Sequence, residues 1–167
     1  WRAKLEVIFF YTKRKCLLTS TTRKAEAMNP QISPEEHCQR LKDLQRKVKE
    51  RELDMFIVTS FESIFYLTGA GFEPLERPFF LLVEADGPPV LLVPKLDQEH
   101  MAKAHGIERH NIISYREYPA PMGSSWPSRL KEALPRRGQI GVEPTVRREL
   151  TDQLEDFSLR TESLVEQ

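Results

Sequence analysis

The sequence predicts an α/β domain built on a mixed β-sheet that is flanked by helices. Helix-like and strand-like segments alternate along most of the chain. Residues 54–60 form a short, nearly continuous apolar run, which is typical of a strand covered on both faces. Asp86-Gly87 separates two apolar runs and is a hairpin signal, so one pair of strands is expected to be antiparallel.

The size and composition fit one ordinary globular domain. On folding, a chain of 167 residues buries about 70% of the surface that its unfolded form exposes. Its hydrophobic core can therefore stabilise the fold without a metal ion or disulfide bonds. The formal net charge is zero, so neither a nucleic acid nor an anionic membrane is expected as a partner. Cys16 and Cys38 lie far apart and in no metal-ligand spacing, which predicts unpaired thiols and a cytoplasmic protein.

Residues 1–27 differ from the rest of the chain because they hold seven basic and two acidic residues. A targeting peptide is one interpretation, but the apolar patch is short and no small-residue cleavage site follows it. We expect instead that Met28 is the native start and that this leader is disordered or not native. The folded domain is accordingly predicted over residues 28–167.

The first helix is expected to begin at Pro34. Ser33 is a good N-cap, Pro34 suits the first helical position, and Glu36 is placed to complete a capping box. Behind them, apolar residues recur at helical spacing and predict one buried face: Cys38, Leu41, Leu44 and Val48.

The next elements follow from caps, runs and turn residues. Ser60 can cap a short helix, Phe61 to Leu67, that ends at Gly69. Strands are predicted at 79–83 and 90–93, on either side of the hairpin signal. The elements expected after them are a helix at 95–104 stopped by Gly106, a strand at 111–115, a helix at 128–134, a strand at 139–142 and a helix at 147–156.

The histidines do not predict a metal site. His100, His105 and His110 are spaced by five, which turns successive side chains by about 140° on a helix. They would not share a face, and no H-E-x-x-H sequence is present. A shared metal site is therefore not expected.

No sequence motif predicts a catalytic centre within this chain. Ser124 and Ser125 are not in a G-x-S-x-G elbow, and Gly69 and Gly71 do not form a phosphate-binding loop. The acidic pairs Glu35-Glu36 and Asp152/Glu155 fall at predicted helix starts or surfaces, where the helix dipole explains them. We expect no catalytic residue and no cofactor within this chain, which indicates either part of a larger enzyme or a binding module.

Several motifs, taken in order, resemble a known family. They are Arg40-Leu41, the run from Leu53 to Ser60, Ile64-Phe-Tyr-Leu-Thr-Gly69, Leu91-Leu-Val-Pro94 and Ile140-Gly-Val-Glu143. Over about residues 36–165 this pattern resembles the N-terminal domain of the creatinase, prolidase and aminopeptidase P family. The resemblance implies a ribonuclease-H-like α/β fold.

The resemblance also implies a second, pita-bread catalytic domain that follows this one. In metallopeptidase members that domain holds two divalent metal ions, such as Mn, Co or Zn, whereas creatinase works without metal. The sequence given stops at Leu164-Val-Glu-Gln167, about where the linker to such a domain is expected. A homodimer is implied as well, with the N-terminal domain of one subunit helping to wall the active site of the other.

In creatinase-like members, an aromatic residue and an arginine after the Tyr-x-x-Gly loop help to hold the substrate. Phe72 and Arg77 are the positions that can correspond. An arginine fork suits a substrate carboxylate, but Arg77 can also pair locally with Glu73 or Glu76 at little energetic gain. Phe72 can equally be a loop anchor on the core.

Three more side chains have simple interpretations. Tyr66 and Leu67 are predicted to lie in the core, and Trp126 either covers the Pro-rich loop or takes part in a subunit contact. The function predicted is that of a non-catalytic N-terminal domain of a Xaa-Pro peptidase-like hydrolase. A stand-alone ligand-binding or regulatory module is the alternative.

Overall fold

Six strands form one mixed sheet at the centre of the computed structural model, which describes residues 32–73 and 76–165. The strand order across the sheet is β4-β3-β2-β1-β5-β6. The strands are β1 (Met55–Val58), β2 (Phe80–Glu84), β3 (Val90–Pro94), β4 (Ile112–Tyr115), β5 (Gln139–Val142) and β6 (Ser158–Thr161). The predicted leader, residues 1–27, lies outside the described residues.

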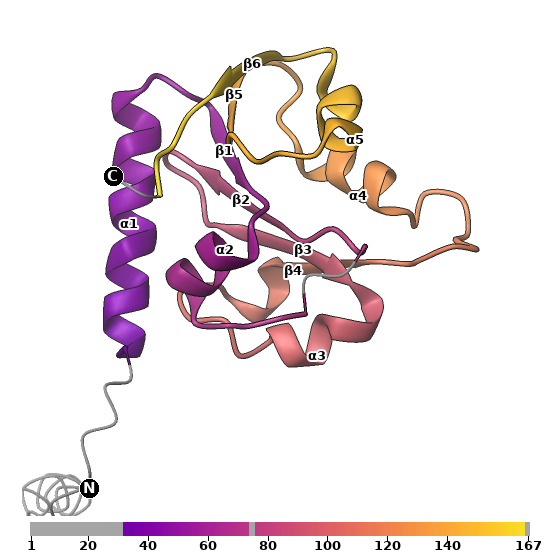
Figure 1. Cartoon of the computed structure of the whole chain (residues 1–167), viewed down its shortest axis with the longest axis horizontal. Coiled ribbons are helices and arrows are strands. Elements are labelled where there is room, and N and C mark those ends of the chain that lie inside the picture. Colours follow the sequence, from indigo (N-terminus) through magenta and orange to yellow (C-terminus); the bar gives the residue numbers. More distant parts are fainter. Residues whose placement is uncertain (1–31, 74–75, 166–167) are drawn as a thin grey trace, which may run out of the picture. The chain divides into compact units, whose positions relative to one another are not determined.

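The strand pairing confirms the mixed sheet. β2 is antiparallel to β3, as the Asp86-Gly87 hairpin signal predicts, and it is also antiparallel to its other neighbour, β1. The other three pairs, β1 with β5, β3 with β4 and β5 with β6, are parallel. The sheet therefore has parallel strands toward both edges and an antiparallel centre (Figure 1).

Side chains of the central strands alternate between two hydrophobic cores. Phe56 and Val58 of β1 face the first core, whereas Met55 and Ile57 face the second. Since successive side chains of a strand point to opposite faces, the continuous apolar run of β1 serves both cores at once.

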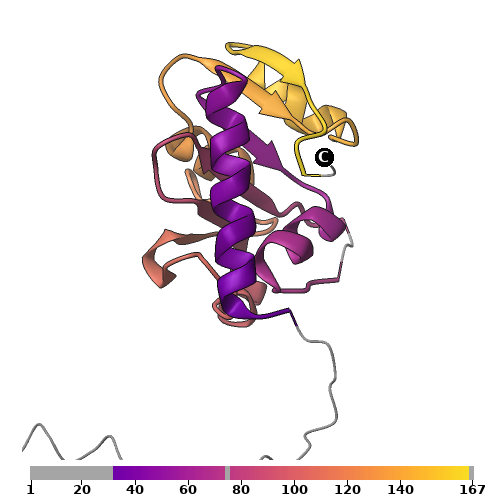
Figure 2. The same ribbon diagram turned by 90° about the vertical axis from the view of Figure 1, so that its left-hand side faces the viewer.

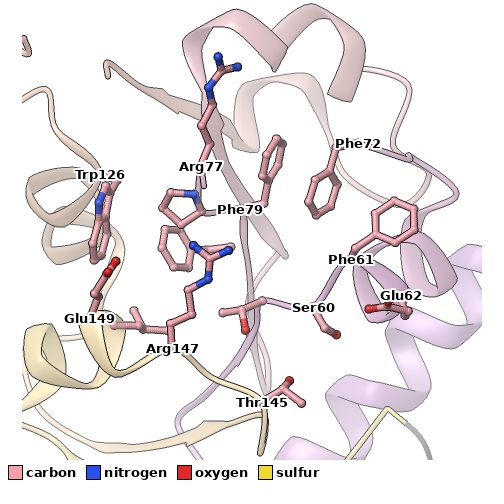
Figure 3. A pocket seen from close by; sticks show the side chains of 14 residues that line it. Ser60, Phe61, Glu62, Phe72, Arg77, Phe79, Trp126, Thr145, Arg147 and Glu149 are labelled. Atoms are coloured by element: carbon pink, nitrogen blue, oxygen red, sulfur yellow. The ribbon is translucent and has the colours of Figure 1, made fainter. Parts of the chain in front are cut away.

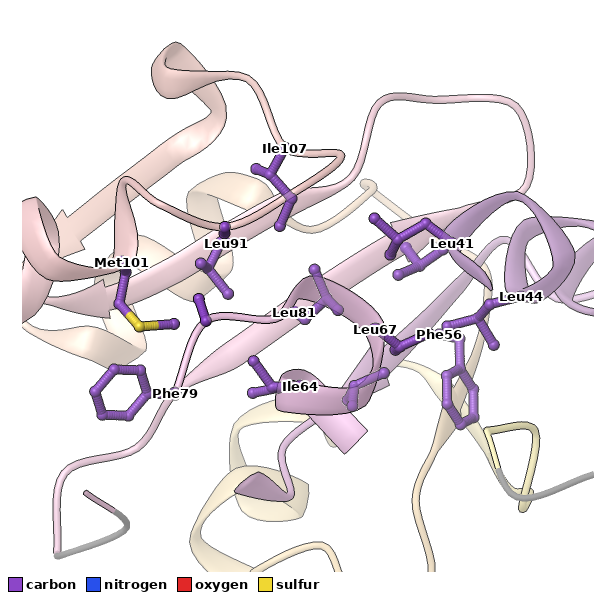
Figure 4. Close-up of a cluster of buried hydrophobic side chains, with 14 of the residues drawn as sticks. Leu41, Leu44, Phe56, Ile64, Leu67, Phe79, Leu81, Leu91, Met101 and Ile107 are labelled. Atoms are coloured by element: carbon purple, nitrogen blue, oxygen red, sulfur yellow. The ribbon is translucent and has the colours of Figure 1, made fainter. Parts of the chain in front are cut away.

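The first face is covered by α1 (Pro34–Glu50), α2 (Phe61–Thr68) and the short α3 (Gln98–Met101), which continues the 3-10 helix η1 (Lys95–Asp97). Figure 2 shows α1 running lengthwise over this side of the domain. Figure 4 shows apolar side chains from these helices meeting those of the strands, among them Leu44, Phe56 and Ile64.

The second face is covered by α4 (Trp126–Ala133), α5 (Arg148–Thr151) and the 3-10 helix η3 (Asp152–Leu154). Their buried contacts with the sheet are made by Leu130, Leu150 and Leu154. A further 3-10 helix, η2 (Arg109–Asn111), leads into β4. Helices thus lie on both faces of the sheet, as predicted.

Ser33 caps the first helix as predicted, but Glu36 bonds Arg40 instead of completing the capping box, and His37 takes the place of Cys38 in the buried row. Ser33 Oγ accepts the Glu36 N–H at 3.2 Å, while the Glu36 carboxylate accepts from Arg40 Nε at 3.1 Å. The buried row is His37, Leu41, Leu44 and Val48, and Cys38 is half-buried. The prediction for Cys38 was wrong because His37 occupies the core side of the first turn, where its ring stacks on His105 with centroids 5.3 Å apart.

Three helix boundaries differ from the prediction by two residues or more. The helix expected at 95–104 ends at Met101, and the helix expected at 147–156 ends at Leu154. The helix expected from residue 128 already begins at Trp126. Strand β6 was not predicted, because Ser158–Thr161 is an edge strand whose side chains are exposed or half-buried and show no apolar alternation.

Candidate functional site

A pocket of about 220 Å³ lies at the edge of the sheet where β1 and β5 end. Because these strands are parallel, both carboxyl ends reach the same edge, and the antiparallel β2 begins there. The pocket is lined by Thr59 and Ser60 after β1, by Thr145 and Arg147 after β5, and by Pro78 to Phe80 at the start of β2. The sheet topology therefore gathers residues that are far apart in the sequence.

A buried carboxylate fixes the rim of this pocket. Glu143, which is 6% exposed, follows β5 directly. Its Oε2 accepts the Thr59 N–H at 2.6 Å and the Ser60 N–H at 2.8 Å, and its Oε1 accepts the Ser60 hydroxyl at 2.8 Å. Ser60 is also the N-cap of α2. The end of β5 is thereby tied to the turn that starts α2.

Aromatic side chains form one wall of the pocket (Figure 3). The Phe72 and Phe79 rings are stacked with centroids 3.8 Å apart, and Phe61 meets Phe72 edge to face at 5.2 Å. On the other side, Trp126 packs against Phe80 with centroids 5.4 Å apart. This arrangement offers flat apolar surfaces to a ligand.

The two candidate residues from the sequence, Phe72 and Arg77, line this same pocket. Phe72 packs on the first core, as the anchor interpretation predicts. Its substrate-binding role stays a prediction.

Arg77 pairs with residues distant in the sequence and not with Glu73 or Glu76. Its Nε lies 3.1 Å from Glu117 Oε2, and its Nη1 lies 3.8 Å from Asp97 Oδ2. Figure 3 shows its guanidinium pointing away from the aromatic side chains. The predicted local pairing was wrong. Arg77 lies just before β2, and its side chain reaches acidic residues in the segments that follow β3 and β4.

Arg147 is the arginine whose side chain points in among the residues that line the pocket (Figure 3). Its Nη1 donates to the Glu76 carbonyl at 3.2 Å, which links the loop after β5 to the loop before β2. Two carboxylates, Glu62 and Glu149, also line the pocket. Sequence reasoning treated Arg147 as a helix start, and no local pattern places this residue, five positions after the end of β5, beside the loop at Glu76.

Tyr115 supports the opposite rim from within the second core. Its hydroxyl donates to the Pro78 carbonyl at 3.0 Å. Burial, followed by the nearby Glu117 carboxylate, raises the pKa of Tyr115 far above its usual value. The hydroxyl therefore remains a donor, and the position of Pro78 is held, throughout the neutral range.

The other aromatic residues named from the sequence have clear positions. Leu67 is buried as predicted, but Tyr66 is 44% exposed. The Tyr66 prediction was wrong because α2 turns this ring outward, where the Arg40 guanidinium lies 4.0 Å from its centroid. Trp126 packs on the second core, between the pocket and the Pro-rich loop.

The three histidines have separate partners. His100 Nε2 lies 2.7 Å from the Gly71 carbonyl, His105 stacks on His37, and His110 pairs with Glu108. Within residues 32–73 and 76–165, no group of three or more His, Cys, Asp or Glu side chains is arranged to hold a metal ion. In the same residues, no helix is long and apolar enough to cross a membrane.

The sequence profile of the Creatinase/Prolidase N-terminal domain matches residues 40–162. The chain belongs to this family. The match covers most of the described part of the chain, including all the residues that line the pocket.

Two similar curated proteins are uncharacterized peptidases of two Staphylococcus epidermidis strains, each 32% identical over 82 residues. These alignments cover 49% of this chain but 23% of each relative. The aligned part of the chain therefore spans about a quarter of the length of the curated relatives that it matches.

Solved structures share the fold. A proline dipeptidase from Streptococcus pneumoniae is 26% identical, with a TM-score of 0.60 over 72% of this chain and 89% of that chain. The Creatinase/Prolidase N-terminal domain of an X-Pro dipeptidase from Streptococcus pyogenes is 24% identical, with a TM-score of 0.61 over 74% of this chain and 98% of that one. The fold predicted from the sequence is confirmed.

Proposed function

We propose that this chain is the non-catalytic N-terminal domain of a Xaa-Pro aminopeptidase-like or dipeptidase-like hydrolase. The observation that carries the proposal is the family match over residues 40–162. The similar N-terminal domain from Streptococcus pyogenes comes from an X-Pro dipeptidase, which supports this substrate class. The domain's roles would be dimerisation and the shaping of substrate access in a cytoplasmic enzyme.

Catalysis would belong to a following pita-bread domain. The described residues offer no three-ligand group for a metal ion, so the two divalent ions of a metallopeptidase would be held by residues outside them. The contribution of this domain would be to bind and to orient the substrate.

Phe72 and Arg77 are the residues proposed to reach the substrate. Phe72 is fixed by its stacking on Phe79. The Arg77 side chain is 32% exposed and its partners Glu117 and Asp97 are similarly exposed, so these ion pairs contribute only about 0–1 kcal/mol. A substrate carboxylate can therefore compete for the Arg77 fork at small cost.

The test is steady-state kinetics of the longer protein that carries this domain, with a Xaa-Pro dipeptide as substrate. Arg77→Gln is expected to raise KM about tenfold or more, because a charge-assisted hydrogen bond contributes roughly 1.5–3 kcal/mol. Phe72→Leu is expected to raise KM by less, and kcat should change less than KM in both variants.

Arg109→Gln is the matched control, because Arg109 forms an exposed ion pair with Glu99 away from the pocket. It should leave KM unchanged. If Arg77→Gln and Phe72→Leu behave like this control, these residues do not wall the active site.

A stand-alone ligand-binding or regulatory module is a second candidate function. The observation that favours it is the pocket itself, which is lined by residues from the turns after β1 and β5 and from the start of β2. Saturable binding by the 167-residue chain, without peptidase activity in any longer form of the protein, would select this candidate.

A further inference from the structure

We propose that the pocket at the carboxyl ends of β1 and β5 binds an amino acid or peptide C-terminus with an apolar side chain, and that Arg147 recognises its α-carboxylate. This site goes beyond the wall formed by Phe72 and Arg77, because Arg147 and the loop after β5 recognise the ligand. Binding there would not depend on the peptidase activity proposed above.

The sheet topology favours a ligand at this position. β1 and β5 are neighbouring parallel strands. After β1 the chain continues into α2 on the first face of the sheet, whereas after β5 it continues into α5 on the second face. Open α/β sheets bind ligands in the crevice that forms where the connections diverge in this way, outside the carboxyl ends of the strands. The pocket occupies this crevice.

The walls and the volume match one apolar side chain. Phe72, Phe79 and Trp126 present ring surfaces to the cavity. A cavity of about 150 Å³ holds a benzene ring, so 220 Å³ accommodates a ring together with a carboxylate-sized group. A larger ligand would have to extend out of the pocket.

The charged groups match the two ends of an amino acid. The Arg147 guanidinium points in among the lining side chains (Figure 3), and its planar fork can engage a carboxylate alongside the Glu76 carbonyl. Glu62 and Glu149 lie at the same pocket and can accept from an ammonium group. Thr145 places a hydroxyl beside them.

The site is held in place before a ligand arrives. Glu143 ties the turn at Thr59 and Ser60 to the end of β5, and Tyr115 holds the carbonyl of Pro78. Arg147 is itself tethered to the loop before β2. Such preorganisation lowers the entropy lost when a small ligand binds.

The first test is isothermal titration calorimetry of the 167-residue chain with L-phenylalanine, 3-phenylpropanoate and L-phenylalaninamide. The first two carry a carboxylate and are expected to bind saturably, whereas the amide should bind about tenfold more weakly or worse. Equal affinity for the amide, or no saturable binding at millimolar concentration, would overturn the proposal.

Glycyl-L-phenylalanine distinguishes the two sources of the carboxylate. Tighter binding than L-phenylalanine supports the site as one for peptide C-termini, and weaker binding supports it as one for free amino acids.

The second test compares Arg147→Gln with Arg148→Gln, the adjacent arginine, which does not line the pocket and lies 3.8 Å from Asp152. Arg147→Gln should weaken L-phenylalanine binding about tenfold, while Arg148→Gln should bind like the unmodified chain. Equal binding by all three would contradict the role of Arg147.

A nuclear magnetic resonance measurement on the unmodified chain tests the site even if a variant fails to fold. In the unmodified chain, L-phenylalanine should shift the indole N–H resonance of Trp126, identified by its loss in Trp126→Phe. Binding that leaves this resonance in place would show that the ligand sits elsewhere. Loss of peptidase activity in a longer form would leave each of these results unaffected, so failure of the two proposals can be told apart.

Discussion

At the residue scale, Gly141 explains one of the motifs. It lies in the middle of β5, and a Cβ added there would come within 2.6 Å of Leu53 Cδ1 and of Phe56 Cδ2. The glycine of Ile140-Gly-Val-Glu143 thus lets the first core, at Leu53 and Phe56, pack directly against the backbone of β5. A sequence pattern cannot reveal this role, because it depends on the side chain that crosses from β1.

Gly141→Ala is expected to destabilise the domain by about 1–3 kcal/mol, the usual cost of overpacking a filled core. Thermal and chemical denaturation of the chain measure this change in the free energy of unfolding.

Gly71→Ala is the matched control, because the nearest atom to its added Cβ would be Phe65 Cδ2 at an ordinary 3.6 Å. A Gly141→Ala variant as stable as the Gly71→Ala variant would contradict the close packing of β5 on β1.

Single residues of the site were only partly predictable. Phe72 and Arg77 could be named only through the family resemblance, from their place after Tyr66-Leu-Thr-Gly69, and the structure brings both to one pocket. Arg147 could not, because its nearness to the loop at Glu76 arises from sheet pairing across the domain. The burial of His37 in place of Cys38 likewise depends on its stacking with the distant His105.

At the scale of elements, a carboxylate holds each end of the parallel pair β1 and β5. Asp54 Oδ2 accepts the Gln139 N–H at 2.7 Å where the strands begin, and Glu143 accepts from Thr59 and Ser60 where they end. Charge-assisted hydrogen bonds of this kind are roughly twice as strong as neutral ones. They fix the pair that carries the pocket.

Glu143→Gln is expected to lower the free energy of unfolding by about 1–3 kcal/mol, because a neutral amide accepts more weakly and brings N–H donors toward the donors of Thr59 and Ser60. Urea denaturation monitored by circular dichroism gives the value.

Glu155→Gln removes the same charge from an exposed position and should change stability by no more than about 0.5 kcal/mol. Equal stability of the two variants would show that the Glu143 carboxylate does not hold the rim.

Elements with strong local signals were predicted well. The Ser33-Pro34 start, the Gly69 stop with its φ of 70° and the Asp86-Gly87 hairpin all appear as expected. The elements that were misjudged are short or lie at an edge, such as α3, α5 and β6. Their ends are decided by packing against the sheet, so local residue patterns carry little information about them.

At the scale of the whole molecule, the sheet and its two helical layers belong to the Creatinase/Prolidase N-terminal domain family. Topology brings Phe72, Arg77 and Arg147 to one edge from three separate segments. In the function proposed, that edge serves substrate binding, and the chemistry of peptide hydrolysis is carried out by another domain.

The most direct test of this account measures hydrolysis of a Xaa-Pro dipeptide, in the presence of Mn²⁺, by the purified 167-residue chain and by the longer protein that carries it. The account predicts turnover by the longer protein and none by the chain alone. Metal-dependent turnover by the chain alone, or no turnover by the longer protein, would contradict it.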